Sequence, residues 1–132
     1  HHVGNTKSDT LFKSLTANNS NCSFWGLIEV ESGALKSDAY QLARTMILHD
    51  SAKAALVPNL KIKANDVRCT HGASYSRLST NDLFYCASRG ISQSEARQLL
   101  TMGFLVEASS RVPSFEQDFL ESLERKLWNL KF

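Results

Sequence analysis

The sequence has few of the residues that build disulfide-rich or membrane-spanning proteins. Its 132 residues include only three cysteines, Cys22, Cys69 and Cys86, without a Cys-x-x-Cys pair. An odd and dispersed set of thiols argues against a disulfide framework and favours a reducing compartment. No apolar run approaches the ~20 residues that a membrane-spanning helix needs, and the first residues do not resemble a secretory signal. We therefore expect no membrane partner.

The sequence also lacks a strong charge bias. It has 15 basic and 13 acidic residues, which give a net charge of +2, and the basic residues form no tract. Nucleic acid is therefore not the expected partner. With 42% hydrophobic and 21% charged residues, the composition is typical of a globular protein.

Nucleotide-binding and hydrolase motifs are missing as well. The chain contains no GxxxxGK[ST] loop, no GxGxxG after an expected strand and no nucleophile elbow. Nothing in the sequence therefore indicates that this chain binds ATP.

Alternating apolar and polar residues predict short strands through the first part of the chain. The clearest strand covers residues 22–31, and another is expected at 10–16. A further strand is expected from the alternation at residues 60–64, with Pro58 marking its start. Residues 38–48 also alternate, although their composition favours a helix; we expect a strand because their neighbours are strands. The strands recur at a spacing of about 13–15 residues, which fits a stacked solenoid or a sandwich. Spacing alone leaves both open.

From Ser79 onward the pattern is helical. Ser79 is the expected cap of a first helix that Gly90 ends, and Ser92 with Glu95 fits the capping box of a second. A third helix is expected after Pro113. Its apolar stripe either packs internally or docks a partner, and it consists of Phe115, Phe119, Leu123, Leu127 and Leu130.

Cys69 and His71 form the most reactive pair in the sequence. In an extended segment, Val67, Cys69 and His71 point to the same side. A thiol beside an imidazole suits iron or zinc, but most structural sites of these metals need four ligands. The pattern by itself favours a packed thiol next to a hydrogen-bonded histidine over a metal site. Cys22 and Cys86 are expected to be structural, since Cys86 lies within an apolar helix.

A longer pattern resembles a known family. NDVRCTHGASYSRLSTNDLFYCASRG, residues 65–90, followed by Ala-Arg-x-Leu-Leu, resembles the SufB/SufD scaffold proteins of SUF iron–sulfur cluster assembly. The likeness continues upstream through TKSDTLFKSL, FWGLIEV, KSDAYQLARTMIL and NLKIKANDV, so that it covers about residues 3 to 107.

Within that family the chain looks more like SufD than SufB. The cysteine that SufB needs for cluster building corresponds to Ala43 here, and the Glu-His-Glu group of SufB corresponds to residues 70–72, where only His71 is kept. The segment HVGNTKS, at the start of the sequence, is slightly more similar to SufB than to SufD.

The resemblance implies a right-handed parallel β-helix core over residues 3–78, followed by a helical subdomain over 79–132. It further implies that the chain is the C-terminal part of a longer protein. Resemblance thus favours the solenoid where spacing leaves a choice.

The implied role is a non-catalytic subunit of a complex with SufB and the ATPase SufC. A transient iron–sulfur cluster or iron would be shared with SufB, with His71 as metal ligand and Cys69 as a second candidate. Arg89 and Gly90, in the helical part 82–107, would face SufC, and an edge at residues 60–71 would pair with SufB. Whether the chain forms a homodimer in the absence of SufB stays open, and the compartment would be the bacterial cytoplasm or the plastid stroma.

Two alternatives remain at this point. One is a SufB-type scaffold that binds a cluster by itself, which Ala43 argues against. The other is a β-solenoid hydrolase or lyase that uses His71 as a base; Asp66 is the near carboxylate, but its expected side is opposite.

Overall fold

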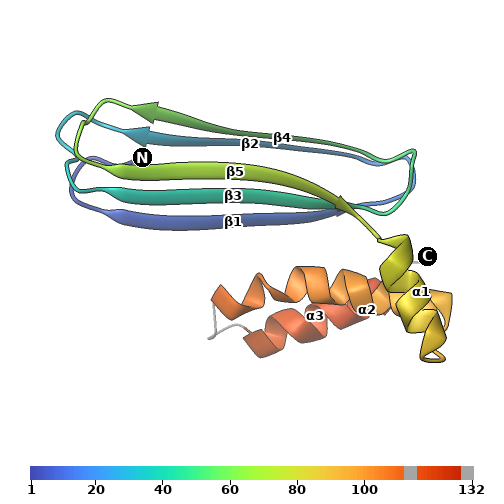
Figure 1. The fold of residues 1–132 in the computed structure, drawn as a ribbon. Coiled ribbons are helices and arrows are strands. Elements are labelled where there is room, and N and C mark those ends of the chain that lie inside the picture. The colour runs from blue at the N-terminus through green and yellow to red at the C-terminus, as the bar shows by residue number, and fades with distance from the viewer. Residues whose placement is uncertain (112–115, 129–132) are drawn as a thin grey trace. The chain divides into compact units, whose positions relative to one another are not determined.

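The computed structural model describes residues 1–111 and 116–128, and it places strands first and helices after them (Figure 1). This order confirms the predicted class, β followed by α. Pro113, Phe115 and Leu130, which were assigned to the third helix and its stripe, lie outside the described residues. The strands are β1 (Lys7–Thr16), β2 (Asn21–Val30), β3 (Asp38–Ile47), β4 (Lys53–Ile62) and β5 (Arg68–Arg77), and the helices are α1 (Thr80–Ser88), α2 (Gln93–Val106), the 3₁₀ turn η1 (Ser109–Arg111) and α3 (Glu116–Trp128).

Successive strands belong to different sheets. One sheet has the order β1-β3-β5 and the other pairs β2 with β4. The β1–β3 and β2–β4 pairs are parallel, with Lys7 opposite Asp38 and Asn21 opposite Lys53. In Figure 1 the arrows of β1, β3 and β5 run one way and those of β2 and β4 run the other way. Each strand therefore pairs with the strand two places along the chain, which accounts for the even spacing in the sequence.

The predicted alternation is confirmed in β2. Gly26, Ile28 and Val30 are buried, whereas Trp25 and Leu27 are exposed. The segment with an ambiguous composition, residues 38–48, is also a strand, because β3 lies between β1 and β5 and alternates buried with half-buried residues. Position in the sheet thus overrides the helical propensity of its residues.

Two details of the strand prediction were wrong. Pro58 does not start a strand but lies inside β4, opposite Gly26. A proline is tolerated there because β4 has a neighbour on one side only, so a missing N–H need not break a ladder.

The edge expected at residues 60–71 is also not one strand. β4 ends at Ile62 and β5 begins at Arg68, in the other sheet. The turn between them is fixed at Asp66, whose carbonyl accepts a hydrogen bond from the backbone N–H of Lys36 and whose carboxylate lies 2.5 Å from the Lys36 ammonium.

The interior between the sheets mixes small apolar and polar side chains. Its apolar core consists of Ile28, Val30, Ala34, Ala39 and Ala64. The rings of Phe12 in β1 and Phe24 in β2 stack with centroids 4.4 Å apart and join the two sheets. Hydroxyl, amide and imidazole groups are buried as well, namely those of His2, Thr16, Ser37, Gln41 and Thr45.

Gly26 permits one of these polar groups to approach the backbone closely. A Cβ at this position would lie 2.4 Å from Oε1 of Gln41, whose side chain is only 6% exposed. A side chain on residue 26 would therefore have to displace a buried amide.

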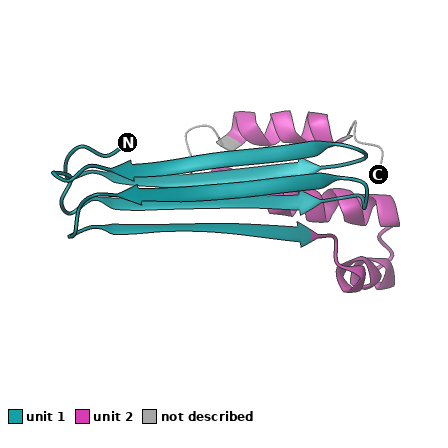
Figure 2. Ribbon diagram, turned by 90° about the horizontal axis from the view of Figure 1, so that it is seen from above, with its two compact units in different colours: residues 1–76 teal, residues 77–132 magenta. Residues whose placement is uncertain are grey.

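The chain divides into two compact units, residues 1–76 and 77–132, coloured separately in Figure 2. In the second unit the predicted caps are confirmed. The hydroxyl of Ser79 accepts a hydrogen bond from the N–H of Asp82, and Ser92 and Glu95 form a complete capping box. Gly90 ends α1 with a φ of +81°, a conformation that favours glycine.

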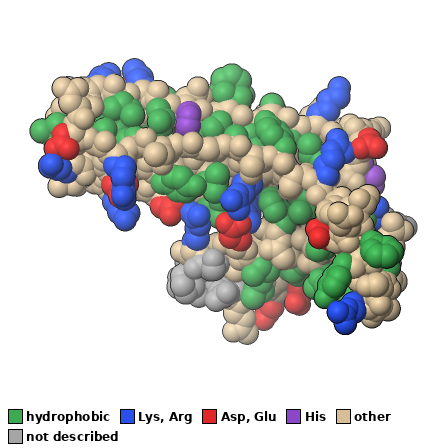
Figure 3. Space-filling view, viewed as in Figure 1, with side chains coloured by type: hydrophobic (Ala, Val, Ile, Leu, Met, Phe, Trp, Pro, Cys, Tyr) green, Lys and Arg blue, Asp and Glu red, His purple; other side chains and the backbone are tan. Residues whose placement is uncertain are grey.

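Charged residues of both signs are interspersed. On the face shown in Figure 3, basic and acidic side chains lie next to one another rather than gathering by sign. Among the described residues, no helix has the length and apolar character needed to span a bilayer.

Candidate functional site

Strand β5 carries both predicted metal ligands and lies at the end of its sheet, with β3 as its neighbour. Arg68 fixes the start of β5, because its guanidinium donates to both carboxylate oxygens of Asp38 on β3, over 3.1 and 2.5 Å. This charged hydrogen bond also holds the pKa of Asp38 below its usual value. Farther along, a Cβ on Gly72 would lie 3.2 Å from the Leu42 side chain, so the strands approach closely there.

His71 and Cys69 have different surroundings. His71 is exposed, and within the described part of the chain its ring makes no hydrogen bond or ion pair. Cys69 is half-buried and packs against the apolar core that contains Ile28 and Val30. An exposed imidazole is free to bind a metal, whereas the thiol already contributes to packing.

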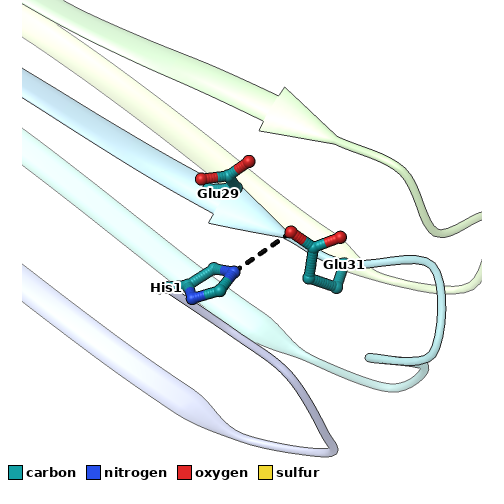
Figure 4. A group of neighbouring side chains, drawn as sticks. All are labelled: His1, Glu29 and Glu31. Carbon is teal, nitrogen blue, oxygen red and sulfur yellow. Dashed lines mark hydrogen bonds and ion pairs between the residues drawn. The ribbon is translucent and has the colours of Figure 1, made fainter.

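Within the described residues, neither Cys69 nor His71 belongs to a complete metal centre. Among residues 1–111 and 116–128, the ligand-bearing side chains that converge as a group of three are His1, Glu29 and Glu31, whose ligand atoms lie within 4.8 Å of one another. Figure 4 shows the three side chains at the end of β2, with the imidazole of His1 3.2 Å from the Glu31 carboxylate. Cys69 and His71 offer two donors, fewer than the four that most iron–sulfur or zinc sites use.

The group of His1, Glu29 and Glu31 is part of an ion-pair network. The Lys61 ammonium lies 2.6 Å from Glu29, and the Lys63 ammonium lies 2.8 Å from Glu31 and 3.7 Å from Glu29. The hydrogen bond from Lys61 lowers the pKa of Glu29, and the one to Glu31 raises the pKa of Lys63. The two ammonium groups already neutralise the two carboxylates, and these ion pairs connect the C-terminal end of β2 with that of β4. The nearby positive charge disfavours the binding of a divalent cation.

Sequence reasoning missed this group. The only signal was that Glu29 and Glu31 share a side of a strand; the contact of His1 comes from a distant part of the chain. His2 is part of the packed structure of the strand unit. It is buried, and its ring nitrogens lie 2.5 Å from the Thr6 hydroxyl and 2.9 Å from the Ser8 hydroxyl.

The turn that ends α1 brings Arg89 and Gly90 to the surface of the helical unit. The Arg89 guanidinium lies 5.3 Å from the centroid of the Tyr85 ring, a cation–π distance. Phe84 and Tyr85 are exposed, and Cys86 is buried, as expected for a structural thiol.

Nothing in the described residues assembles a hydrolytic site around His71. Asp66, the nearest carboxylate in sequence, is paired with Lys36. Ala43 is fully buried in β3, and its side chain has no ligand atom.

Comparison with known proteins shows the family of the chain. Residues 1–104 match the family described as "SUF system FeS cluster assembly, SufBD core domain". The chain is 31% identical over 129 residues to the iron–sulfur cluster assembly protein SufD of Escherichia coli, 34% identical over 106 residues to SufD of Bacillus subtilis, and 39% identical over 93 residues to the chloroplastic protein ABCI7 of Arabidopsis thaliana. These matches cover 96%, 79% and 70% of the chain, but only 30%, 24% and 20% of the respective relatives.

Proposed function

The chain belongs to the SufBD core domain family of the SUF iron–sulfur cluster assembly system, and from this membership we propose that it acts as a SufD-like, non-catalytic scaffold subunit. The observation that carries the proposal is the match of residues 1–104, together with the likeness to a SufD protein over 96% of the chain. In this role the chain assembles with SufB and the ATPase SufC, and the nascent cluster is cargo rather than a resident cofactor.

The strands then form successive coils of a right-handed parallel β-helix, in which each coil contributes one strand to each sheet, with the core over residues 3–78 and the helical subdomain over 79–132. The alternation of strands between two sheets and the parallel β1–β3 and β2–β4 pairs support this assignment. In a solenoid each coil pairs with its neighbours only, as these strands do.

His71 is the proposed ligand or iron-entry residue. Its exposure and its place on β5, the last strand of its sheet, leave it accessible to a second chain. Because Cys69 and His71 supply two donors at most, a cluster at this position would require ligands from SufB. Cys69 remains the second candidate; its packing against the core makes a ligand role dependent on movement of the thiol.

The edge of β5 is the proposed surface for SufB, and for a second copy of this chain when SufB is absent. β4 is less suited to this role, because Pro58 removes one of its N–H donors and because it contains Lys53 and Lys61, with Lys63 directly after it. β5 contains neither proline nor lysine, and small residues occupy much of its length. Backbone pairing along such an edge can extend a sheet into a partner.

The helical part 82–107 is the proposed contact for SufC, with Arg89 and Gly90 shaping the turn at its surface. Exposed aromatic residues on α1 support this assignment, because Phe84 and Tyr85 are not covered within the unit. We place the complex in the bacterial cytoplasm or the plastid stroma, since the relatives include bacterial proteins and one called chloroplastic.

Co-expression with SufB and SufC tests the proposal. The chain should co-purify with both proteins, and His71→Ala should leave its folding and its binding to SufC unchanged, because the residue is exposed and lies outside the helical unit. A chain that stays separate from SufB and SufC would contradict the role. A stable cluster on this chain alone, after anaerobic incubation with iron and sulfide, would instead support a SufB-type scaffold.

A further inference from the structure

Gln41 and His71 lie opposite each other in the three-stranded sheet. β3 lies beside β5, and the two strands run the same way (Figure 1). The backbone N–H of Arg68 donates to the carbonyl of Ser37, so Arg68 lies opposite Asp38. Three residues farther along each strand, this register places His71 opposite Gln41. The next position of β5 contacts the next position of β3, which agrees with the register.

The His71 ring lies on the inner side of β5. Cys69, two residues earlier, packs against the apolar core, and Tyr75, four residues later, reaches Leu56 on the opposite sheet. Side chains alternate along a strand, so His71 shares the side of these two residues. It is exposed because, in the described chain, no strand covers β5 on the side away from β3. The ring therefore has β3 on one side and open space on the other.

Gln41 offers the polar side chain in the part of β3 beside this ring. The inward-facing residues before and after it, Ala39 and Ala43, are buried and have no polar side-chain atom. Gln41 is 6% exposed, and its Oε1 is enclosed without a hydrogen-bond partner among the described residues. The amide lies against Gly26 of the facing sheet, which brings no side chain to it. A buried acceptor without a partner is rare in folded proteins, and here it lies beside a ring whose nitrogens are also unpaired.

We propose that Gln41 is a positioning residue for His71, whose ring N–H donates a hydrogen bond to Oε1 of Gln41. Only rotation about side-chain bonds is needed, because the two backbones are already paired. A histidine that binds a metal nearly always donates its other ring nitrogen to an acceptor, which fixes the tautomer and the orientation of the ring. With one nitrogen held against β3, the other keeps its lone pair and faces the surface where iron would bind. This inference rests on the proposed role of His71, and it names the residue that orients the ligand.

Nuclear magnetic resonance of the full chain, labelled with ¹⁵N-histidine, tests the hydrogen bond without a partner protein. His71→Ala assigns the ring signals. The wild type should show a His71 ring N–H that exchanges slowly with water, because the hydrogen bond protects it. Gln41→Met has a similar length but no carbonyl, so it should accelerate this exchange by about two- to tenfold. Gln41→Glu keeps an oxygen acceptor and should retain the protection.

Thr10→Val is the matched control. Thr10 lies opposite Gln41 on β1, the other neighbour of β3, so this variant removes the competing hydroxyl donor. Its His71 N–H should exchange as in the wild type. Urea unfolding of all the variants verifies that the strand unit is folded.

Cluster assembly with SufB and SufC gives the second measurement. Gln41→Met should raise the iron concentration that gives half-maximal cluster absorbance by about tenfold, because the partner of a ligating histidine affects metal affinity to this extent. Gln41→Glu should stay close to the wild type, whereas a purely packing role of Gln41 would make both variants equal.

The outcomes separate this inference from the proposed function. A His71 ring N–H that exchanges freely in the wild type would overturn the inference without any variant. Equal exchange in the wild type and in Gln41→Met would also overturn it, even if His71→Ala lowers the cluster yield. A protected N–H that is lost in Gln41→Met, together with a normal cluster yield in His71→Ala, would confirm the hydrogen bond and contradict the proposed role of His71 instead.

Discussion

The phenol oxygen of Tyr75 accepts a hydrogen bond from the backbone N–H of Leu56 over 2.9 Å, and thereby joins the outer strands of the two sheets. Tyr75 lies on β5 and Leu56 on β4, which has a sheet neighbour on one side only. The Tyr75 hydroxyl thus provides a hydrogen-bond acceptor for the Leu56 amide, which lies on an outer strand of the two-stranded sheet. This bond ties β5, the strand that carries His71, to the opposite sheet.

Removing the Tyr75 hydroxyl should loosen this connection. We expect Tyr75→Phe to lower the free energy of unfolding by about 0.5–1.5 kcal/mol, because the Leu56 amide loses its partner while the ring keeps its contacts. Urea unfolding measures the change. Tyr85→Phe is the control, since that residue is exposed on α1. Equal stability of the two variants would show that the bond contributes nothing.

Gly26 should be sensitive to the smallest substitution. Gly26→Ala would place a methyl group 2.4 Å from Oε1 of the buried Gln41 side chain. We therefore expect the free energy of unfolding to fall by about 1–3 kcal/mol. Gly33→Ala is the control, because no atom lies within 4 Å of the added carbon. Thermal unfolding of both variants compares them, and an unaffected Gly26→Ala would mean that the Gln41 amide moves aside easily.

Acid should weaken both units through three carboxylates. The pKa values of Glu29, Asp38 and Glu95 are lowered by hydrogen bonds from Lys61, Arg68 and Ser92, respectively. Because the folded pKa lies below the unfolded one, the stabilisation is present above the ordinary carboxyl range and is lost as the pH falls through the folded values. The urea midpoint should therefore be flat near neutral pH and should decline below about pH 4–5.

Asp38→Asn provides the check on this pH effect. The variant should show a shallower decline in acid, since one of the three titrating groups is gone. The exposed ion pairs should also weaken as salt is added. A decline of unchanged steepness in Asp38→Asn would assign the acid sensitivity to other groups.

The local features of the fold were predictable from the sequence. Alternation gave β2, because Ile28 and Val30 face the interior and Trp25 faces out. The caps at Ser79 and Ser92 depend on side-chain hydrogen bonds within three residues, so composition reveals them directly. Such short-range interactions do not require knowledge of the partner strand.

The features that were predicted wrongly or not predicted depend on contacts between distant parts of the chain. The position of Pro58 inside β4 follows from β4 having one neighbour, which spacing does not reveal. The Tyr75–Leu56 bond and the meeting of His1 with Glu31 join segments that only the stacked sheets bring together. For the candidate site, the pattern identified Cys69 and His71 as a pair, but not that one is packed and the other exposed.

The central claim is that His71 contributes to cluster assembly at the boundary with SufB. The most direct measurement is the cluster absorbance of the complex with SufB and SufC after anaerobic reconstitution with iron and sulfide. His71→Ala should lower the absorbance while folding and SufC binding stay intact, and Thr70→Ala, an exposed neighbour on β5, should match the wild type. A His71→Ala complex that forms clusters in normal yield would contradict the account.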